Sequence, residues 1–284
     1  MNTFKKTTLA LAISALAGGA IAQSAPAPAP EPEKSPITAN VTVVNDYRYR
    51  GISQSNFKPA IQGGFDYAHE SGFYIGNWNS SISWISDSST FNGGRTTTVS
   101  APIEMDFYAG FKKELIAPGF ASDIGVLQYY YPATGLANGV TNPNTTEIYL
   151  AQNFTFGPIT GFGKFSYAVT TLFGNANTTG SYYPDLTLNY DTGVWGITAN
   201  AHVGYQYFAG NASPRVSNSA LYSYTDWKLG LTKDFGGGLA LSAAYVGTNS
   251  PSSGTVNGAA KGQFSPSGQN LGKGGAVVAL TKTF

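Results

Sequence analysis

Apolar and polar residues alternate with a period of two along most of this chain, from residue 39 to its end. Successive side chains of a β-strand point to opposite faces, so this alternation sets one face against an apolar phase and the other against a polar one. In 39–51, for example, Val41, Val43, Tyr47 and Tyr49 share one parity and Asp46, Arg48 and Arg50 share the other, with Val44 and Asn45 as exceptions. In 122–131, apolar pairs occur on both parities, so the alternation does not indicate which face of this strand points inward. The twelve predicted strands are 39–51, 60–68, 73–84, 103–112, 122–131, 145–156, 159–170, 182–190, 194–208, 224–233, 239–246 and 275–284.

The connections between these segments alternate between long and short. Four of the short ones, 69–72, 157–158, 191–193 and 234–238, contain the glycines expected of tight turns. Outer-membrane barrels show this alternation because their periplasmic turns are tight and their extracellular loops are long. Most of the predicted strands are also longer than is usual in soluble sheets and long enough to cross a bilayer when tilted. Both features favour a membrane barrel over a soluble sandwich.

The composition agrees with a chain that is partly covered by an apolar phase. Only 11% of the 284 residues are charged, 14% are aromatic, and there are 35 glycines and no cysteine. Soluble domains carry about 25% charged residues. The absence of cysteine excludes a disulfide scaffold and any thiolate nucleophile or metal ligand.

The first 38 residues predict an export signal and a tether. Lys5 and Lys6 precede a short apolar run, and the small residues 20–22 form a cleavage site, so residues 1–22 are expected to be a signal peptide. The Ala/Pro-rich segment 23–38 is expected to be an extended periplasmic linker. Cleavage would leave 14 bases against 15 acids, with no basic patch that would suggest nucleic acid.

The C-terminal residue, Phe284, closes a strand whose alternate residues are mostly apolar. This end looks like the terminal strand of outer-membrane barrels, whose final aromatic resembles the element read by the barrel-assembly machinery. With an even strand number, the sequence predicts an all-β, transmembrane, antiparallel up-and-down β-barrel of about twelve strands over 39–284, in the outer membrane of a Gram-negative bacterium.

Several short motifs carry a resemblance to a known family. The stretch DYRYRGISQ (46–54), followed by PAIQGGFDYAHESGFYIG (59–76), resembles the opening of the TorF porin family, also known as the Gcw_chp conserved hypothetical family. Later blocks EMDFYAG (104–110), YYYP (129–132) and TEIY (146–149) are similar to that family as well. The resemblance implies an outer-membrane β-barrel with a transport function, and it supplies neither a substrate nor functional residues.

Charged residues on the inward parity are the candidates for a pore. The acids are Asp46, Asp66, Glu104, Asp106, Glu147, Asp185 and Asp226, and the bases are Arg48, Arg50, Lys112, Lys164 and Lys228. Most fall in the predicted outer half, where opposed charges can form a constriction that selects permeants by charge and size. The predicted pore-lining residues are therefore Arg48, Arg50, Asp66, Glu104, Asp106, Glu147, Lys164, Asp185, His202, Asp226 and Lys228. The same charges could instead pair and close the lumen, and the Gly/Ser-rich segment 247–274 could fold inward or stay outside.

These residues predict a channel for passive passage of small polar solutes or ions, without a cofactor. The alternatives are a closed structural or adhesion barrel and an outer-membrane hydrolase. His69 lies in a predicted periplasmic turn beside Ser71, and His202 points inward with no assignable serine, so neither predicts a catalytic triad. No cluster of ligands suggests a metal site.

Aromatic residues on the outward parity are expected to form girdles at the two membrane interfaces. They are Tyr47, Tyr49, Tyr74, Trp78, Trp84, Trp195, Tyr205, Tyr207 and Trp227. Lys233 and Lys282 are expected to snorkel at the periplasmic rim.

Overall fold

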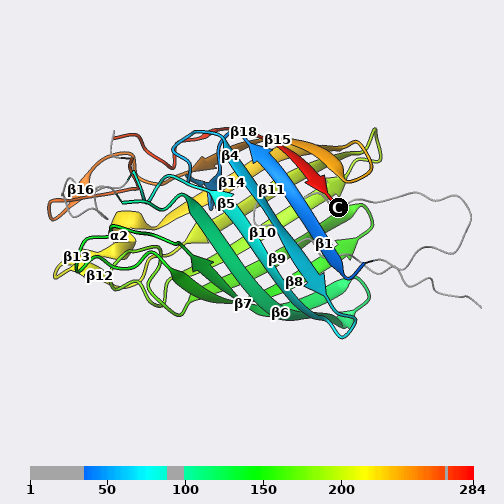
Figure 1. Cartoon of the computed structure of the whole chain (residues 1–284), viewed down its shortest axis with the longest axis horizontal. Coiled ribbons are helices and arrows are strands. Elements are labelled where there is room, and N and C mark those ends of the chain that lie inside the picture. The colour runs from blue at the N-terminus through cyan, green and yellow to red at the C-terminus, as the bar shows by residue number, and fades with distance from the viewer. Residues whose placement is uncertain (1–34, 88–98, 266–267) are drawn as a thin grey trace, which may run out of the picture.

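The computed structural model describes residues 35–87, 99–265 and 268–284, and within them twelve antiparallel strands form a closed barrel (Figure 1). The strands are β1 (Ile37–Val44), β4 (Ala60–Ala68), β5 (Phe73–Ser81), β6 (Ile103–Ala117), β7 (Phe120–Tyr130), β8 (Thr145–Phe156), β9 (Ile159–Ala168), β10 (Tyr182–Asp191), β11 (Ile197–Gln206), β14 (Tyr224–Asp234), β15 (Leu239–Thr248) and β18 (Gly275–Thr283). Each strand pairs with its neighbours in chain order, and β18 pairs with β1. The predicted fold class is confirmed. The predicted signal peptide (1–22) and most of the linker (23–38) lie outside the described residues.

The two ends of the barrel differ, and we call them the turn end and the loop end. Tight connections such as 69–72 and 157–158 join strands at the turn end, where the C-terminus also lies (Figure 1). Longer connections at the loop end carry short elements of their own. These elements are β2 (Arg48–Tyr49), β3 (Ile52–Ser53), β12 (Asn211–Ser213), β13 (Val216–Ser217), α2 (Asn218–Tyr222), β16 (Thr255–Val256) and β17 (Ala259–Ala260). Among the described helices, none has the length and apolar character to cross a membrane.

The strands present apolar side chains outward and polar or aromatic side chains to the lumen. On β8, Ile148 and Leu150 are exposed on the outer face, whereas Glu147 and Tyr149 are buried inside. Phe107 and Leu229, at 45% and 61% exposure, belong to the same outer surface. A barrel in lipid needs this arrangement because its backbone groups are paired within the closed sheet and only side chains meet the hydrocarbon.

The first strand is shorter than predicted, and this is the main correction to the expected fold. It begins at Ile37 and ends at Val44, so the segment after it is not part of the barrel wall. Asn45 marks the departure: its side chain accepts the N–H of Val278 at 2.7 Å and donates to the carbonyl of Ala276 at 3.1 Å. The main-chain N–H of Asn45 also donates to the carbonyl of Val278 at 3.1 Å, so main chain and carboxamide together extend the pairing with β18 beyond Val44.

The parity predicted for the third strand is wrong. Tyr74 and Trp78 of β5 are buried in the lumen, and Phe73 and Ile75 are exposed on the outer face. Asn77 is on the outward parity, opposite the exposed Phe65 and Phe107 in the neighbouring strands.

The chain ends on the outer rim of the turn end. The main chain of Phe284 exchanges hydrogen bonds with that of Ala39, which extends the pairing of β18 with β1 to the last residue. Its side chain is exposed, and the ammonium of Lys282 lies 5.5 Å from its ring centre. Trp195 is also exposed at the turn end, and Tyr205 and Trp227 lie on the outer face as predicted.

Candidate functional site: a hairpin inside the lumen

The connection between β1 and β4, residues 45–59, folds into the lumen, and we call it the inner hairpin. Within it β2 pairs with β3, and the two residues between them, Arg50 and Gly51, have φ values of 45° and 77°. Two left-handed residues match the twist of a two-residue hairpin turn, a position where Asn-Gly is the usual sequence. A Cβ at Gly51 would collide with the side chains of Thr248 and Asp226, so this position requires glycine.

Arg50, at the tip of the inner hairpin, crosses the lumen to the opposite wall. Its guanidinium binds both carboxylate oxygens of Glu147, at 2.7 and 3.0 Å, and donates to Oε1 of Gln206 at 2.5 Å. It also lies over the ring of Tyr183, 4.2 Å from the centre. Arg50 and Glu147 are only 6% and 1% exposed. A bidentate pair with an additional acceptor and an aromatic face satisfies a buried guanidinium well.

Arg48 fixes the base of the same hairpin. Its guanidinium pairs with Asp46, which also accepts a hydrogen bond from Ser53 at 2.7 Å. Arg48 further donates to the carbonyls of Gly51 at 3.0 Å and Lys273 at 2.8 Å. The second contact attaches the hairpin to the connection between β15 and β18, so part of the Gly/Ser-rich segment packs against the inner hairpin.

Tyrosines connect the hairpin to the acids of β6. Glu104 accepts one hydrogen bond from Tyr47 at 2.5 Å and another from Tyr131 at 2.7 Å. Burial raises the pKa of the Tyr47 phenol well above its usual value, so this group stays a donor. Asp106, two residues along and 3% exposed, has one carboxylate oxygen with no hydrogen-bond partner among the described residues.

A second polar cluster lies on β10, β11 and β14. Asp226 Oδ1 accepts a hydrogen bond from the Tyr183 hydroxyl at 2.8 Å, and its Oδ2 lies 3.0 Å from His202 Nε2. On the other side of the ring, His202 Nδ1 is 3.0 Å from the Thr187 hydroxyl and 4.0 Å from Asp185. These groups lie directly beneath the Arg50 contact, because Tyr183 belongs to both sets.

The lysines of the lumen are held more loosely than the arginines. Lys164 lies opposite Asp185 in the β9–β10 register, and its ammonium is 4.4 Å from the Tyr149 ring centre. Lys228 is opposite His202 in the β11–β14 register. Lys112 donates a hydrogen bond to Asn153 at 3.0 Å.

The sequence-based selection missed one luminal acid, Asp123. It accepts a hydrogen bond from Tyr74 at 2.6 Å and lies opposite Lys112 across the β6–β7 pair. The signal was the alternative parity of 122–131, because Ile124 and Val126 are the outward residues. Asp66, which was selected, lies apart from the hairpin near the turn end and accepts a hydrogen bond from Tyr108 at 2.6 Å.

All eleven predicted pore-lining side chains thus lie in the lumen, although Arg48 and Arg50 come from the inner hairpin and not from a wall strand. Three residues expected in the outer aromatic girdle do not reach it because they belong to the hairpin or the loop end. Tyr47 and Tyr49 are inside the lumen, and Trp84 packs edge-on against Tyr131.

Groups that could act in catalysis or hold a metal are few. His69 is exposed at the turn end, with Nδ1 2.9 Å from the Ser71 hydroxyl. Across the part of the chain that the structure describes, no three His, Cys, Asp or Glu side chains group as metal ligands.

A family model for "Bacterial protein of unknown function (Gcw_chp)" matches residues 30–284. The chain belongs to this family. No curated protein matches this Gcw_chp chain. Among solved structures it is similar to the KdgM porin, with a TM-score of 0.50, 7% identity, and coverage of 87% of this chain and 98% of that one. It is also similar to the NanC porin, with a TM-score of 0.52, 10% identity, and coverage of 87% and 98%. The Gcw_chp chain therefore has the fold of these porins.

Proposed function

We propose that this chain is an outer-membrane channel through which small polar solutes or ions pass passively. One observation carries the proposal: a closed barrel with an apolar outer face encloses a lumen of charged and hydroxyl-bearing side chains. Hydrocarbon explains the outer face, and water with dissolved solutes is the natural content of such an interior.

The inner hairpin would set the size limit of this channel. It contacts wall residues on several sides of the lumen, including Glu104 on β6, Glu147 on β8 and Gln206 on β11. Permeants would pass beside it or after it shifts. Both routes restrict passage to small molecules.

The resemblance to the TorF porin family supports the same function, and the porin fold of the two similar structures agrees with it. Outer-membrane lipids would surround the barrel after export and signal-peptide removal. The barrel-assembly machinery would recognise the β18 strand ending in Phe284.

A closed barrel without conductance is the second candidate, and the Arg50–Glu147 pair is the observation that favours it. A bidentate pair this deeply buried is costly to separate. A hydrolase has less support. Although Thr187, His202 and Asp226 are in contact, the sheet uses the backbone N–H groups of β10 and β11, which leaves few donors for an oxyanion.

Single-channel recording of the refolded protein in a planar bilayer tests the proposal. We expect discrete conductance steps for the native chain and larger steps for Arg50→Ala, because that variant releases the hairpin tip. Lys58→Ala is the matched control: it removes a positive charge from the same connection, where the side chain is exposed. Silence of both the native and the Arg50→Ala proteins, once folding is verified by heat-dependent gel mobility, would favour the closed barrel.

A further inference from the structure

A cavity of about 80 Å³ lies at the loop end, above the contact between Arg50 and Glu147. The inner hairpin forms one side of it, and parts of four further connections and the ends of β11 and β14 complete it. One water needs about 10–15 Å³ by this measure. The cavity therefore has room for several waters, and because it is partly open, a ring-shaped solute would occupy it with one face and project from its mouth.

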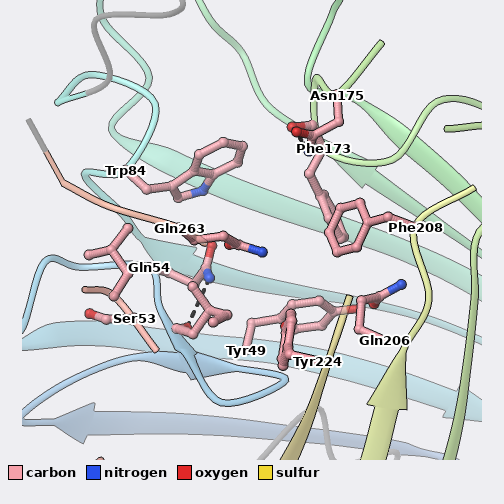
Figure 2. A pocket seen from close by; sticks show the side chains of 12 residues that line it. Tyr49, Ser53, Gln54, Trp84, Phe173, Asn175, Gln206, Phe208, Tyr224 and Gln263 are labelled. Carbon is pink, nitrogen blue, oxygen red and sulfur yellow. Dashed lines mark hydrogen bonds between the residues drawn. The ribbon is translucent and has the colours of Figure 1, made fainter. Parts of the chain in front are cut away.

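Aromatic rings surround this cavity. Figure 2 shows Trp84 on one side, Phe173 and Phe208 facing it from the other, and Tyr49 and Tyr224 between them at the base. The rings of Tyr49 and Phe173 meet edge-on at 5.5 Å, which fixes their orientation. Preformed aromatic faces offer flat apolar surfaces to the C–H groups of a ring-shaped ligand.

The polar groups of the cavity are neutral, and several have no protein partner. Within the described residues, the carboxamide of Gln263 and the hydroxyl of Tyr224 make no hydrogen bond to protein, and Gln54 uses only its N–H, donating to the carbonyl of Ile52 at 3.0 Å (Figure 2). A carboxamide both donates and accepts, so it can bind a hydroxyl in either role.

Among the described residues that line the cavity, none is a lysine, arginine, histidine, aspartate or glutamate. The guanidinium of Arg50, which contacts the lining residue Gln206, is already bound to Glu147, and that of Arg48 is paired with Asp46. A ligand carboxylate would therefore be desolvated here without a cation to pair with, which is unfavourable. This separates the cavity from the rest of the lumen, where charged groups are numerous.

We propose that this cavity binds an uncharged monosaccharide, or a cyclic polyol of similar size, before it enters the channel. Aromatic faces meet the C–H surfaces of the ring, and carboxamides and a phenol meet its hydroxyls. The inference rests on the proposed function and names the class of solute that the channel would admit.

Binding is measured by calorimetry and intrinsic fluorescence on the full barrel in a zwitterionic detergent, since sugar-headed detergents would compete. The probes are glucose and galactose, each compared with its uronic acid. We expect saturable binding of at least one neutral sugar and at least about tenfold weaker binding of the uronates. Gln263→Leu and Gln54→Leu should each weaken binding about five- to tenfold. Gln269→Leu, an exposed glutamine of the same connection as Gln263, should leave it unchanged.

Trp84→Phe locates the site, because it keeps an aromatic face and removes the local fluorophore. The fluorescence change should disappear while the heat of binding remains. Equal or tighter binding of uronates, no binding of either sugar, or a Gln269→Leu effect as large as that of Gln263→Leu would overturn the inference. Conductance without sugar binding would reject only the sugar site. Sugar binding in a barrel that never conducts would reject only the channel.

Discussion

The arginines near the loop end and the lysines of the barrel wall hold their charges in different ways. Arg48 and Arg50 come from a connection and are each bound by several groups, among them Asp46 and Glu147. The wall lysines, such as Lys164, are only half-buried and make few contacts with protein. The arginines therefore act as fixed cross-links, whereas the lysines are held by fewer contacts, such as that of Lys164 with the Tyr149 ring and that of Lys112 with Asn153.

The chemistry of the two side chains explains the difference. A guanidinium is planar, weakly hydrated and able to bind two carboxylate oxygens at once, so it suits a dry contact. An ammonium is compact and strongly hydrated, so it suits a lumen that holds water. The loop half of the lumen is thus cross-linked by guanidinium–carboxylate pairs, whereas the turn half contains tyrosine–carboxylate hydrogen bonds such as that of Tyr74 with Asp123.

The strongest test of this comparison is to remove one charge from each half. Arg50→Ala should lower the free energy of unfolding by about 3–5 kcal/mol, because it leaves the Glu147 carboxylate buried and unpaired. Lys164→Ala should cost less than about 1 kcal/mol, since it removes a single contact of an ammonium with the Tyr149 ring. Urea unfolding in detergent, followed by tryptophan fluorescence, measures both. Equal losses in the free energy of unfolding would mean that the protein holds the Lys164 ammonium as tightly as the Arg50 guanidinium.

A slightly smaller loss in the free energy of unfolding is expected when a charge is added to the outer face of the barrel wall, and little loss when it is added to the luminal face. Leu229→Arg, at the middle of β14 on the outer face, should cost about 2–4 kcal/mol in a lipid bilayer. Thr198→Arg, on the luminal parity of β11 near the turn end, should be tolerated because its side chain faces the polar lumen and not hydrocarbon. Unfolding titrations in liposomes report the two costs, and similar values would contradict the assignment of the luminal and lipid faces.

Ion selectivity should depend on the acids that the hairpin does not neutralise. Replacing Glu104 by Gln and Asp106 by Asn together should lower the cation-to-anion permeability ratio at least about twofold, because these carboxylates concentrate cations. Neutralising Arg48 and Arg50 should raise the ratio. Reversal potentials in a salt gradient measure it. Unchanged values in both double variants would exclude these residues from the constriction.

The smallest perturbation tests the orientation of the two ends. Single cysteines at Asn138 and Ser252, both in loop-end connections, should react with an impermeant thiol reagent on intact cells, and one at Glu70 should not. The chain has no native cysteine to interfere. Exposed substitutions of this kind change stability by less than about 0.5 kcal/mol. Labelling at Glu70 on sealed cells would reverse the orientation.

Strand number, order and closure could be predicted from the sequence because lipid imposes a regular period on every strand that crosses it. The same rule placed the acids Glu104, Asp106 and Glu147 on the luminal face, where they lie. Val44 and Asn45 were the available signs that 39–51 is not one strand, since both depart from the alternation.

The inner hairpin itself could not be predicted from the alternation of apolar and polar residues, because that alternation distinguishes only a lipid face from a polar lumen. Where a connection fills the lumen, the interior becomes dry, and aromatic residues are buried there as readily as they face lipid. Trp78 is predicted outside for this reason, although it packs inside against Tyr47, and Tyr74 shares its parity on β5. The pairing of Arg50 with Glu147 is also invisible in sequence, because 97 residues separate its two partners.

The side chain of Asn45 has a consequence for how the barrel is assembled. Its hydrogen bonds to Ala276 and Val278 join residues 231 and 233 positions apart, and they form only when the first strand has met the last. Neighbouring strands elsewhere are joined through local hairpins, which close quickly. Closing this seam instead costs the conformational entropy of a loop that contains almost the whole chain. The two Asn45 hydrogen bonds are therefore a marker of barrel closure, because they cannot form while β1 and β18 are apart.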